Sequence, residues 1–197
     1  MAQILQSLYK TLFAGLVLLI IVLVITTSIT GNPIQFSHVW STFVVRWLHV
    51  VSGVMWIGLL WYFNFVQIPS MPNIPDEQKP AISKVIAPTA LFWFRYAALA
   101  TVITGLLVAW MQGYIVQALT LQTGVVAIGL GMWIALVMAF NVWFIIWPNQ
   151  KKALGIVVVE APEKAKAARL AMLTSRINTM LSITMLYMMV AQQNAAL

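Results

Sequence analysis

Cysteine is absent from this 197-residue chain, and acidic residues and histidines are scarce. Without cysteine the chain cannot form disulfides, thiolate metal sites, iron–sulfur clusters or the covalent attachment of a c-type haem. The four acidic residues all lie outside the long apolar runs, so no proton-relay carboxylate is expected within a membrane. Hydrolase elbows, phosphate loops and carboxylate dyads are also missing from the sequence.

Charged residues make up only 8% of the chain, and hydrophobic residues make up 62%. A soluble domain would carry roughly a quarter charged residues. This composition predicts an integral membrane protein: an all-α polytopic helix bundle, with residues 1–197 forming a single membrane domain in a lipid bilayer. The net charge of +7 does not indicate nucleic-acid binding, because basic side chains orient a membrane protein.

Five apolar segments approach the length of about 20 residues that a transmembrane helix requires. They cover about residues 12–30, 40–66, 89–111, 121–147 and 177–193, and the last is shorter and more polar than the others. Lys and Arg gather before the first segment and in the second-to-third and fourth-to-fifth connections, and they are absent from the other connections. The positive-inside rule then predicts about five transmembrane helices, a cytoplasmic N-terminus and a periplasmic C-terminus.

Two connections have a composition of their own. Four prolines between residues 69 and 80 are expected to stop a helix from continuing through the second-to-third connection. The fourth-to-fifth connection, about residues 148–175, is expected to be a cytoplasmic loop with a short helix that runs into the fifth span. Pro162 stands near the start of that helix, and good helix formers follow it. No internal repeat is evident, which argues against the inverted halves of a transporter.

His49 lies inside the second apolar run, where an ionisable side chain is costly and by default marks a functional site. Helical spacing puts it on one face with Arg46, Gly53 and Trp56. A neutral imidazole at this depth can offer a nitrogen lone pair to haem iron, and Gly53 would leave room for a flat ligand. The alternative is a histidine that is hydrogen-bonded to a neighbouring helix, with Gly53 serving only helix packing.

Arg46 lies in the same apolar run and needs a partner if it is buried. All four carboxylates of the chain lie in the connections expected to be cytoplasmic, whereas Arg46 is expected in the outer half of its helix. The candidate partners are therefore a cofactor carboxylate such as a haem propionate, a lipid phosphate reached by snorkelling, or another subunit.

Further haem ligands are open from the sequence. His38 stands about three helical turns from His49, so the two cannot bind opposite faces of one haem. Two haems, a site completed by methionine or an external ligand, and an ordinary interfacial His38 are the alternatives. The fifth segment offers several methionines, although methionine is more often a packing residue. These methionines are Met180, Met185, Met188 and Met189.

A second polar group is expected at the cytoplasmic ends of the spans. Its side chains could bind an anionic head group, a quinone or a substrate carbonyl, or they could form hydrogen bonds between helices. The group comprises Asn64, Gln67, Arg95, Asn141, Ser175, Arg176 and Asn178.

Four segments resemble the membrane domain of the bacterial membrane-bound urate oxidase (urate dehydrogenase) family. In chain order they read RWLHVVSGVMWIGLLWYFNFVQIP, FRYAALATVITG, NVWFIIWPNQKK and AARLAMLTSRINTMLSI, within about residues 42–187. The resemblance implies a multi-pass domain of the bacterial cytoplasmic (inner) membrane that oxidises urate or passes electrons to a periplasmic c-type cytochrome. It makes His49 the haem-associated histidine. Positions that match the family motifs without an assigned role are Arg46, Trp56, Asn64, Arg95, Asn141, Arg176 and Asn178.

Members of this family carry a C-terminal cytochrome c domain, whereas the present chain has no Cys-x-x-Cys-His motif. It therefore resembles a short form of the family, and electrons would leave through a separate cytochrome. The leading hypothesis is an oxidoreductase or electron carrier with b-type haem. His49 holds the iron, Arg46 neutralises a propionate, and Gly53 and Trp56 shape the pocket. The second is a non-catalytic accessory subunit of a larger membrane respiratory or oxidase complex. The third is a small-molecule transporter. A homo-oligomer is compatible with each.

Overall fold

The computed structural model describes residues 2–194 and confirms the all-α prediction, with 84% helix and no strand among those residues. The chain divides into two compact units, Met1–Ser41 and Thr42–Leu197. Four helical stretches are long and apolar enough to cross a membrane: Leu8–Thr30, His38–Asn73, Lys79–Met111 and Val126–Ala153. The membrane character of the chain is supported in this way, while the count of about five spans and the orientation of the termini stay predictions.

The first unit is dominated by one helix that is apolar on every side. A short helix α1 (Ala2–Leu5) precedes α2 (Leu8–Thr30), and α2 buries none of its residues. Its hydroxyl side chains bond to carbonyls of their own helix, as Thr26 does to Val22 at 2.8 Å. It ends at Gly31, whose φ of +68° is the left-handed conformation that glycine adopts most easily. Such a helix is suited to a lipid environment on all of its faces.

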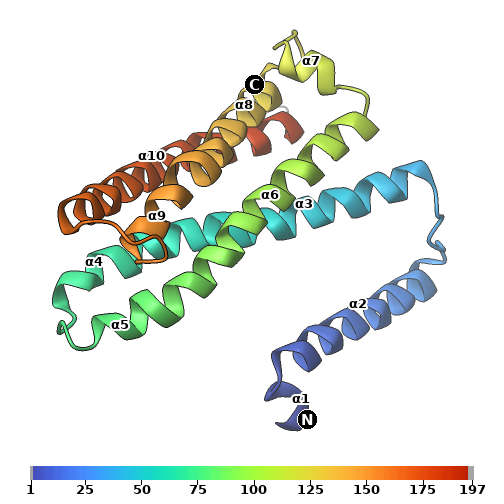
Figure 1. Ribbon diagram of the computed structural model, residues 1–197. Helices are drawn as coiled ribbons and strands as arrows, with labels where there is room; N and C mark the ends of the chain where they lie inside the picture. The colour runs from blue at the N-terminus through green and yellow to red at the C-terminus, as the bar shows by residue number, and fades with distance from the viewer. Residues whose placement is uncertain (1, 195–197) are drawn as a thin grey trace. The chain divides into compact units, whose positions relative to one another are not determined.

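The second unit is a bundle built around four long helical stretches (Figure 1). Short helices α4, α5, α7 and α9 extend or connect the long helices α3, α6, α8 and α10. In chain order the elements are α3 (His38–Trp61), α4 (Ile68–Ser70), α5 (Lys79–Ala81), α6 (Ala87–Met111), α7 (Ile115–Leu119), α8 (Val126–Phe140), α9 (Trp147–Ala153) and α10 (Ala161–Gln193).

The helix that enters the second-to-third connection ends at Asn73, before Pro75, and the next helix begins at Lys79, so the prediction that no helix continues through this connection is confirmed. Other prolines lie inside helical stretches. A π-helical segment precedes three of them, at Tyr62–Gln67, Ile82–Ile86 and Asn141–Ile146. Each segment ends two residues before a proline, and the residue between donates its N–H to the carbonyl five residues back. Because proline has no N–H and its ring crowds the preceding turn, a wider turn lets the helix pass through it. The three prolines are Pro69, Pro88 and Pro148.

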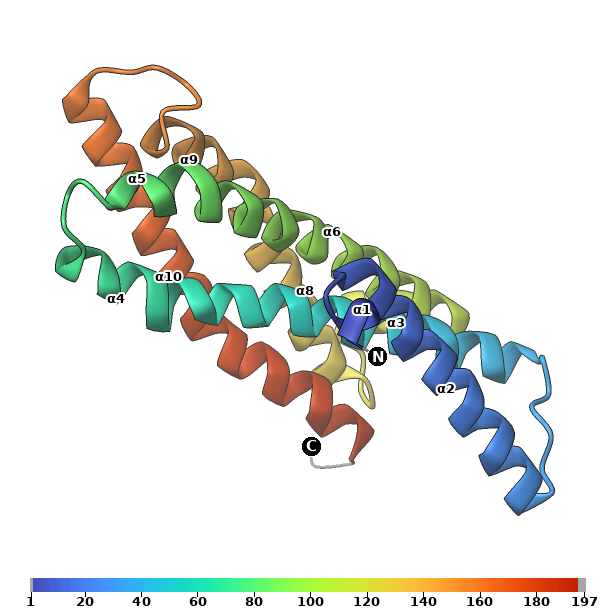
Figure 2. The same cartoon turned by 90° about the horizontal axis from the view of Figure 1, so that it is seen from below.

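The fourth-to-fifth connection is shorter than predicted. Residues 148–153 still belong to α9, and α10 begins at Ala161 and continues without a break to Gln193. With 33 residues, α10 is about 50 Å long, which exceeds the roughly 30 Å hydrocarbon core of a bilayer. It packs along α8 and α9, and Figure 2 shows these three helices from below.

The core of the second unit is split into two apolar clusters. The larger one joins α3, α6, α8 and α10 around the fully buried Trp56 and Leu60, with Phe94 almost fully buried beside them. The smaller one lies where α7 covers the end of the bundle, and it includes Ile128 and Met132. Residues of both clusters line the cavity described below, so the packing of the bundle is interrupted at that level.

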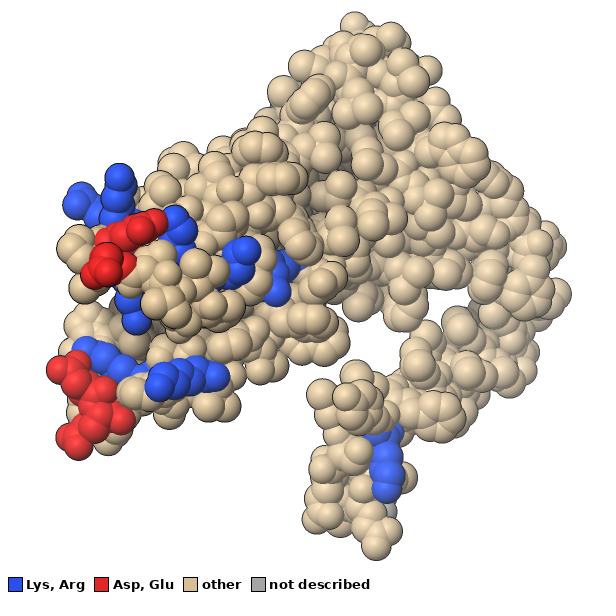
Figure 3. Space-filling view, in the orientation of Figure 1, with Lys and Arg blue, Asp and Glu red and all other residues tan. Residues whose placement is uncertain are grey.

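Charged side chains of the second unit gather at the end formed by α4, α5 and α9 (Figure 3). The opposite end, residues 112–125, carries no charged residue. Two of the acids are paired at the charged end, Asp76 with Lys79 and Glu163 with Lys152, each at 2.6 Å. This one-sided distribution agrees with the lysine and arginine pattern of the sequence, and the membrane face on which it lies stays a prediction.

Candidate functional site

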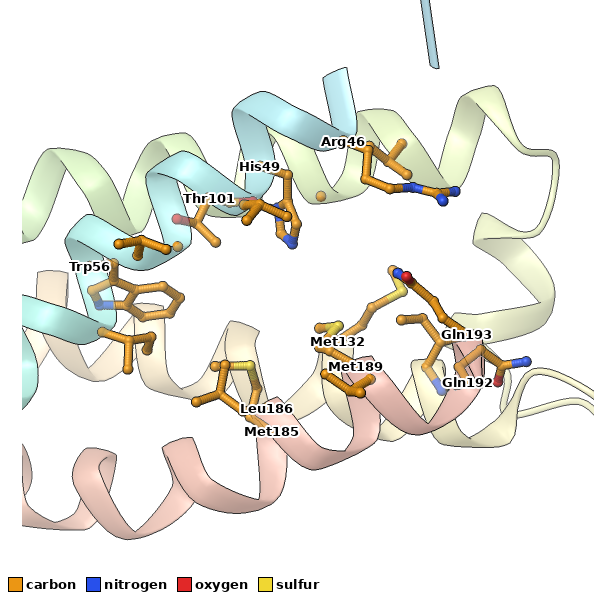
Figure 4. Close-up of a pocket in the computed structure, with 18 of the residues that line it drawn as sticks. Arg46, His49, Trp56, Thr101, Met132, Met185, Leu186, Met189, Gln192 and Gln193 are labelled. Atoms are coloured by element: carbon orange, nitrogen blue, oxygen red, sulfur yellow. Dashed lines mark hydrogen bonds between the residues drawn. The ribbon is translucent and has the colours of Figure 1, made fainter. Parts of the chain in front are cut away.

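A cavity of about 740 Å³ lies inside the second unit, between α3 and α6 on one side and α8 and α10 on the other (Figure 4). Ligand sites for small molecules and cofactors typically measure 300–1,000 Å³ and are mostly apolar, with a few polar groups that fix orientation. All four residues expected to surround a cofactor line this cavity: Arg46, His49, Gly53 and Trp56.

His49 is held in one tautomer by the neighbouring helix α6. Its Nδ1 lies 2.9 Å from the carbonyl oxygen of Thr101, and a carbonyl can only accept a hydrogen bond. Nδ1 therefore carries the proton of the neutral imidazole, and Nε2 keeps a lone pair. Nε2 bonds to none of the described residues and faces the cavity (Figure 4). A histidine that ligates a metal through one nitrogen commonly donates the other N–H to a backbone carbonyl in the same way.

Gly105 makes room for the His49 ring. A Cβ atom built on this glycine would lie 2.8 Å from Cε1 and 3.1 Å from Nδ1 of the imidazole. Any other residue here would displace the ring from its bond to Thr101. Gly53, which the sequence proposed as the space-making glycine, has only the methyl group of Thr101 near its Cβ position, at 3.9 Å. Gly53 therefore leaves space in this wall of the cavity, while Gly105 is the residue that makes room for the His49 ring.

The wall opposite His49 presents thioethers rather than charged groups. Met132 comes from α8, and Met185 and Met189 come from α10 (Figure 4). Within residues 2–194, no group of three or more His, Cys, Asp and Glu side chains could hold a metal ion. The cavity offers one imidazole nitrogen and thioether sulfurs on facing walls, together with the Tyr114 phenol and glutamine amides. Imidazole and thioether are both groups that can ligate haem iron.

One end of the cavity is polar. Arg46 and Gln193 lie at the end of the cavity away from Trp56 (Figure 4), and Gln112 and Tyr114 line the same cavity. The Nε atom of Arg46 is buried and has no hydrogen-bond partner among the described residues. Burial raises the pKa of the Tyr114 phenol, and the nearby Arg46 charge partly offsets this, so Tyr114 is a neutral donor at pH 7. A long apolar cavity with a cationic end fits a flat apolar ligand that carries an acidic group.

Trp56 closes the other end of the cavity. It is 0% exposed, and its Nε1 has no hydrogen-bond partner among the described residues. Buried polar atoms are usually paired, so an unpaired one beside a cavity is compatible with a group that the protein itself does not supply.

The second polar group forms hydrogen bonds between helices rather than an open site. Asn64 donates to Ser175 at 2.8 Å, and Asn141 donates to the fully buried Asn178 at 2.8 Å. Asn178 in turn donates to the carbonyl of Met138 on α8. These bonds fix α10 against the π-helical turns at Tyr62–Gln67 and Asn141–Ile146.

The two arginines of that group lie in different surroundings. Arg95 is 8% exposed and stacks on Trp147, with its Cζ 3.3 Å from the ring centroid. Its Nη1 atom is buried and has no hydrogen-bond partner within residues 2–194. Arg176 is exposed and takes no part in the network. His38 is also exposed, at the first residue of α3.

Sequence reasoning missed the cavity residues that come from α6 and α8. Thr101, Gly105 and Met132 lie in apolar segments. Thr101 and Gly105 fall within the segment FRYAALATVITG, but neither was singled out as a site residue. Spacing on one helix shows which residues share a face, but it does not show which residue of another helix will face them.

Comparisons with known proteins add no identification. No family model matches the chain, and searches of curated proteins and of solved structures also found no match. The resemblance to the urate oxidase membrane domain therefore has no support from these comparisons, and the function has to be argued from the cavity itself.

Proposed function

We propose that the chain binds one b-type haem in the cavity at His49 and works in electron transfer or oxidation within a membrane. The observation that carries the proposal is the state of His49. Its Nδ1 donates a hydrogen bond to the Thr101 carbonyl at 2.9 Å. Its Nε2 bonds to none of the described residues and faces a cavity of about 740 Å³. An imidazole prepared in this way is the usual protein ligand of b-type haem iron.

The ends of the cavity support the same ligand. Haem is flat and apolar except for its two propionates, so it needs apolar walls and a cation at one edge. The buried Nε of Arg46 has no hydrogen-bond partner among the described residues. All four acids of the chain lie at the charged end of the second unit, and two of them pair with lysines there. No carboxylate is therefore placed to pair with Arg46. Arg46 would therefore neutralise a propionate, and Tyr114 and Gln193 would offer it neutral hydrogen-bond donors.

The chain's own residues would tune the group as follows. A bound haem supplies a one-electron couple. His49 would hold the iron, with its ring fixed by Thr101 and Gly105. The apolar walls would exclude water and favour the less charged, reduced state, while Arg46 would offset a propionate charge. We assign the chain on this basis to the bacterial inner membrane, with electrons leaving to a separate c-type cytochrome; urate is one candidate reductant.

The proposal is tested by visible spectroscopy of the purified full-length protein in mild detergent. We expect reduced Soret and α bands of b-type haem at about one haem per chain. His49→Ala should lose the haem, whereas the exposed His38→Ala should keep it. A wild-type protein without haem, or a His49→Ala variant that retains all of it, would refute the proposal.

Two other outcomes would identify the alternatives. A stable stoichiometric membrane complex without an intrinsic cofactor would support an accessory subunit. Solute uptake by proteoliposomes that contain only this chain would support a transporter.

A further inference from the structure

We infer that Met189 is the second axial ligand of the haem, opposite His49. This inference rests on the proposed function, because it concerns the same cavity. It predicts a six-coordinate, low-spin iron with one imidazole and one thioether ligand, where the proposed function alone requires only His49.

The wall opposite His49 leaves few choices. The cavity-lining residues of α8 and α10 are aliphatic side chains, glutamines and three methionines, and thioether sulfur is the one established haem ligand among them. Of the two other methionines that the sequence offered, Met180 is 64% exposed and Met188 is not part of the cavity wall. The candidates are therefore Met132, Met185 and Met189.

Position and packing separate these three. Met185 lies beside Leu186, nearer the Trp56 end of the cavity, whereas Met132 and Met189 face His49 (Figure 4). Met185 and Met132 are 5% and 8% exposed and belong to the two core clusters. Met189 is only half-buried and belongs to neither cluster, but it packs against both. Of the three methionines, Met189 therefore contributes least to the buried core.

A glycine backs Met189 just as a glycine backs His49. A Cβ atom on Gly131 of α8 would lie 3.3 Å from Cε and 3.4 Å from Sδ of Met189. The corresponding atom on Gly105 would lie 2.8 Å from the His49 ring. Each of the two facing side chains is therefore seated against the bare backbone of a neighbouring helix, on opposite sides of one cavity. This contact distinguishes Met189 from Met132 and Met185, neither of which is among the nearest neighbours of a described glycine; Met188 approaches Gly131 only through its Cβ atom, at 3.3 Å.

The inference is tested on the purified haem-loaded protein with Met189→Leu, which conserves volume. We expect a change from six-coordinate low-spin to five-coordinate high-spin spectra and a lower midpoint potential, because a thioether ligand raises the potential. Carbon monoxide should bind the reduced variant at least tenfold faster than the wild type. Met188→Leu, at the neighbouring residue, is the matched control and should leave all three measurements unchanged.

Other outcomes separate this inference from the proposed function. Wild-type protein that binds haem but is five-coordinate, or unchanged spectra in Met189→Leu, would overturn the ligand assignment and leave the haem assignment standing. The same holds if Met132→Leu or Met185→Leu produces the change instead. If Met189→Leu loses haem, Met189→His should restore a six-coordinate low-spin iron, and its failure to do so would overturn the inference.

Discussion

Two helices of the larger unit contain ten-residue segments that are identical at six positions but bury different faces. Residues 55–64 of α3 and its π turn read MWIGLLWYFN, and residues 132–141 of α8 and its π turn read MWIALVMAFN. In α3 the tryptophan is 0% exposed and the methionine 46%; in α8 the methionine is 8% exposed and the tryptophan 47%. The two copies therefore differ by about one residue, roughly 100° of rotation about the helix axis.

Only the α3 copy builds the histidine side of the cavity. Trp56 points inward from α3, whereas Met132 points inward from α8. Seven residues before the tryptophan, α3 has His49, while α8 has the exposed Val126. Both ten-residue segments are apolar, and the last residue of each is an asparagine that bonds to α10. Which side chain enters the cavity is decided by the neighbouring helices.

The largest difference between the two copies should appear at their tryptophans. Trp56→Ala would empty a fully buried position and should lower the free energy of unfolding by roughly 3–5 kcal/mol. Trp133→Ala removes a half-exposed ring and its bond to the Leu119 carbonyl, which should cost about 1 kcal/mol. Thermal unfolding in detergent would measure both. Equal effects would show that the copies are not rotated relative to one another.

The next largest effect, on haem affinity, is expected at Gly105, which makes room for the His49 ring. Gly105→Ala should displace the imidazole from Thr101 and weaken haem binding about 10–100-fold, as the loss of an outer-shell partner of a metal ligand does. Titration of apo-protein with haem would measure the affinity. Gly53→Ala, whose Cβ would meet only a methyl group at 3.9 Å, is the matched control for a glycine of the same cavity. Equal loss in both variants would contradict the role assigned to Gly105.

The two asparagines of the motif should also differ in effect. Asn141→Ala leaves the Oδ1 of the fully buried Asn178 without its donor and should cost about 1–3 kcal/mol. Asn64→Ala should cost about 0.5–1 kcal/mol, because the lost donor to Ser175 is partly offset by removal of the buried Asn64 Oδ1, which has no partner among the described residues. Unfolding in detergent again provides the measurement. A larger loss of stability in Asn64→Ala than in Asn141→Ala would contradict the expected order of the two asparagines.

The smallest effect is expected where the copies differ by one methyl group. Gly58 in α3 corresponds to Ala135 in α8, and a Cβ on Gly58 would meet nothing within 4 Å. Gly58→Ala should therefore raise the free energy of unfolding by about 0.5–1 kcal/mol through helix propensity. A loss of stability or of haem would show that this position contacts the bound ligand.

The sequence predicted the helices and one wall of the site because both depend on local spacing. Arg46, His49 and Trp56 share a face of one helix, so their common position followed from helical periodicity. Gly105 and Gly131 could not be found in this way, because their importance depends on how α6 and α8 are rotated against their neighbours. The repeated motif was overlooked because its two copies match over only ten residues.

The prolines show the same limit at the level of the backbone. Pro69 lies inside a helical stretch that continues to Asn73, because the preceding turn widens. The π turn starts 79 residues later in the second copy, at Asn141 instead of Tyr62, as does the proline, at Pro148 instead of Pro69. The motif itself recurs after 77 residues. The position of the π turn thus follows the proline rather than the motif.

The same three prolines give the bundle a marker of depth that is independent of its charges. Each withholds an N–H from the turn before it, so one carbonyl per helix lacks its helical donor. In hydrocarbon such a group costs several kcal/mol, whereas water or a lipid head group can satisfy it. All three turns lie toward the charged end of the second unit. In a bilayer, the main chain and the side chains would therefore both favour this end of the second unit at the water-exposed boundary.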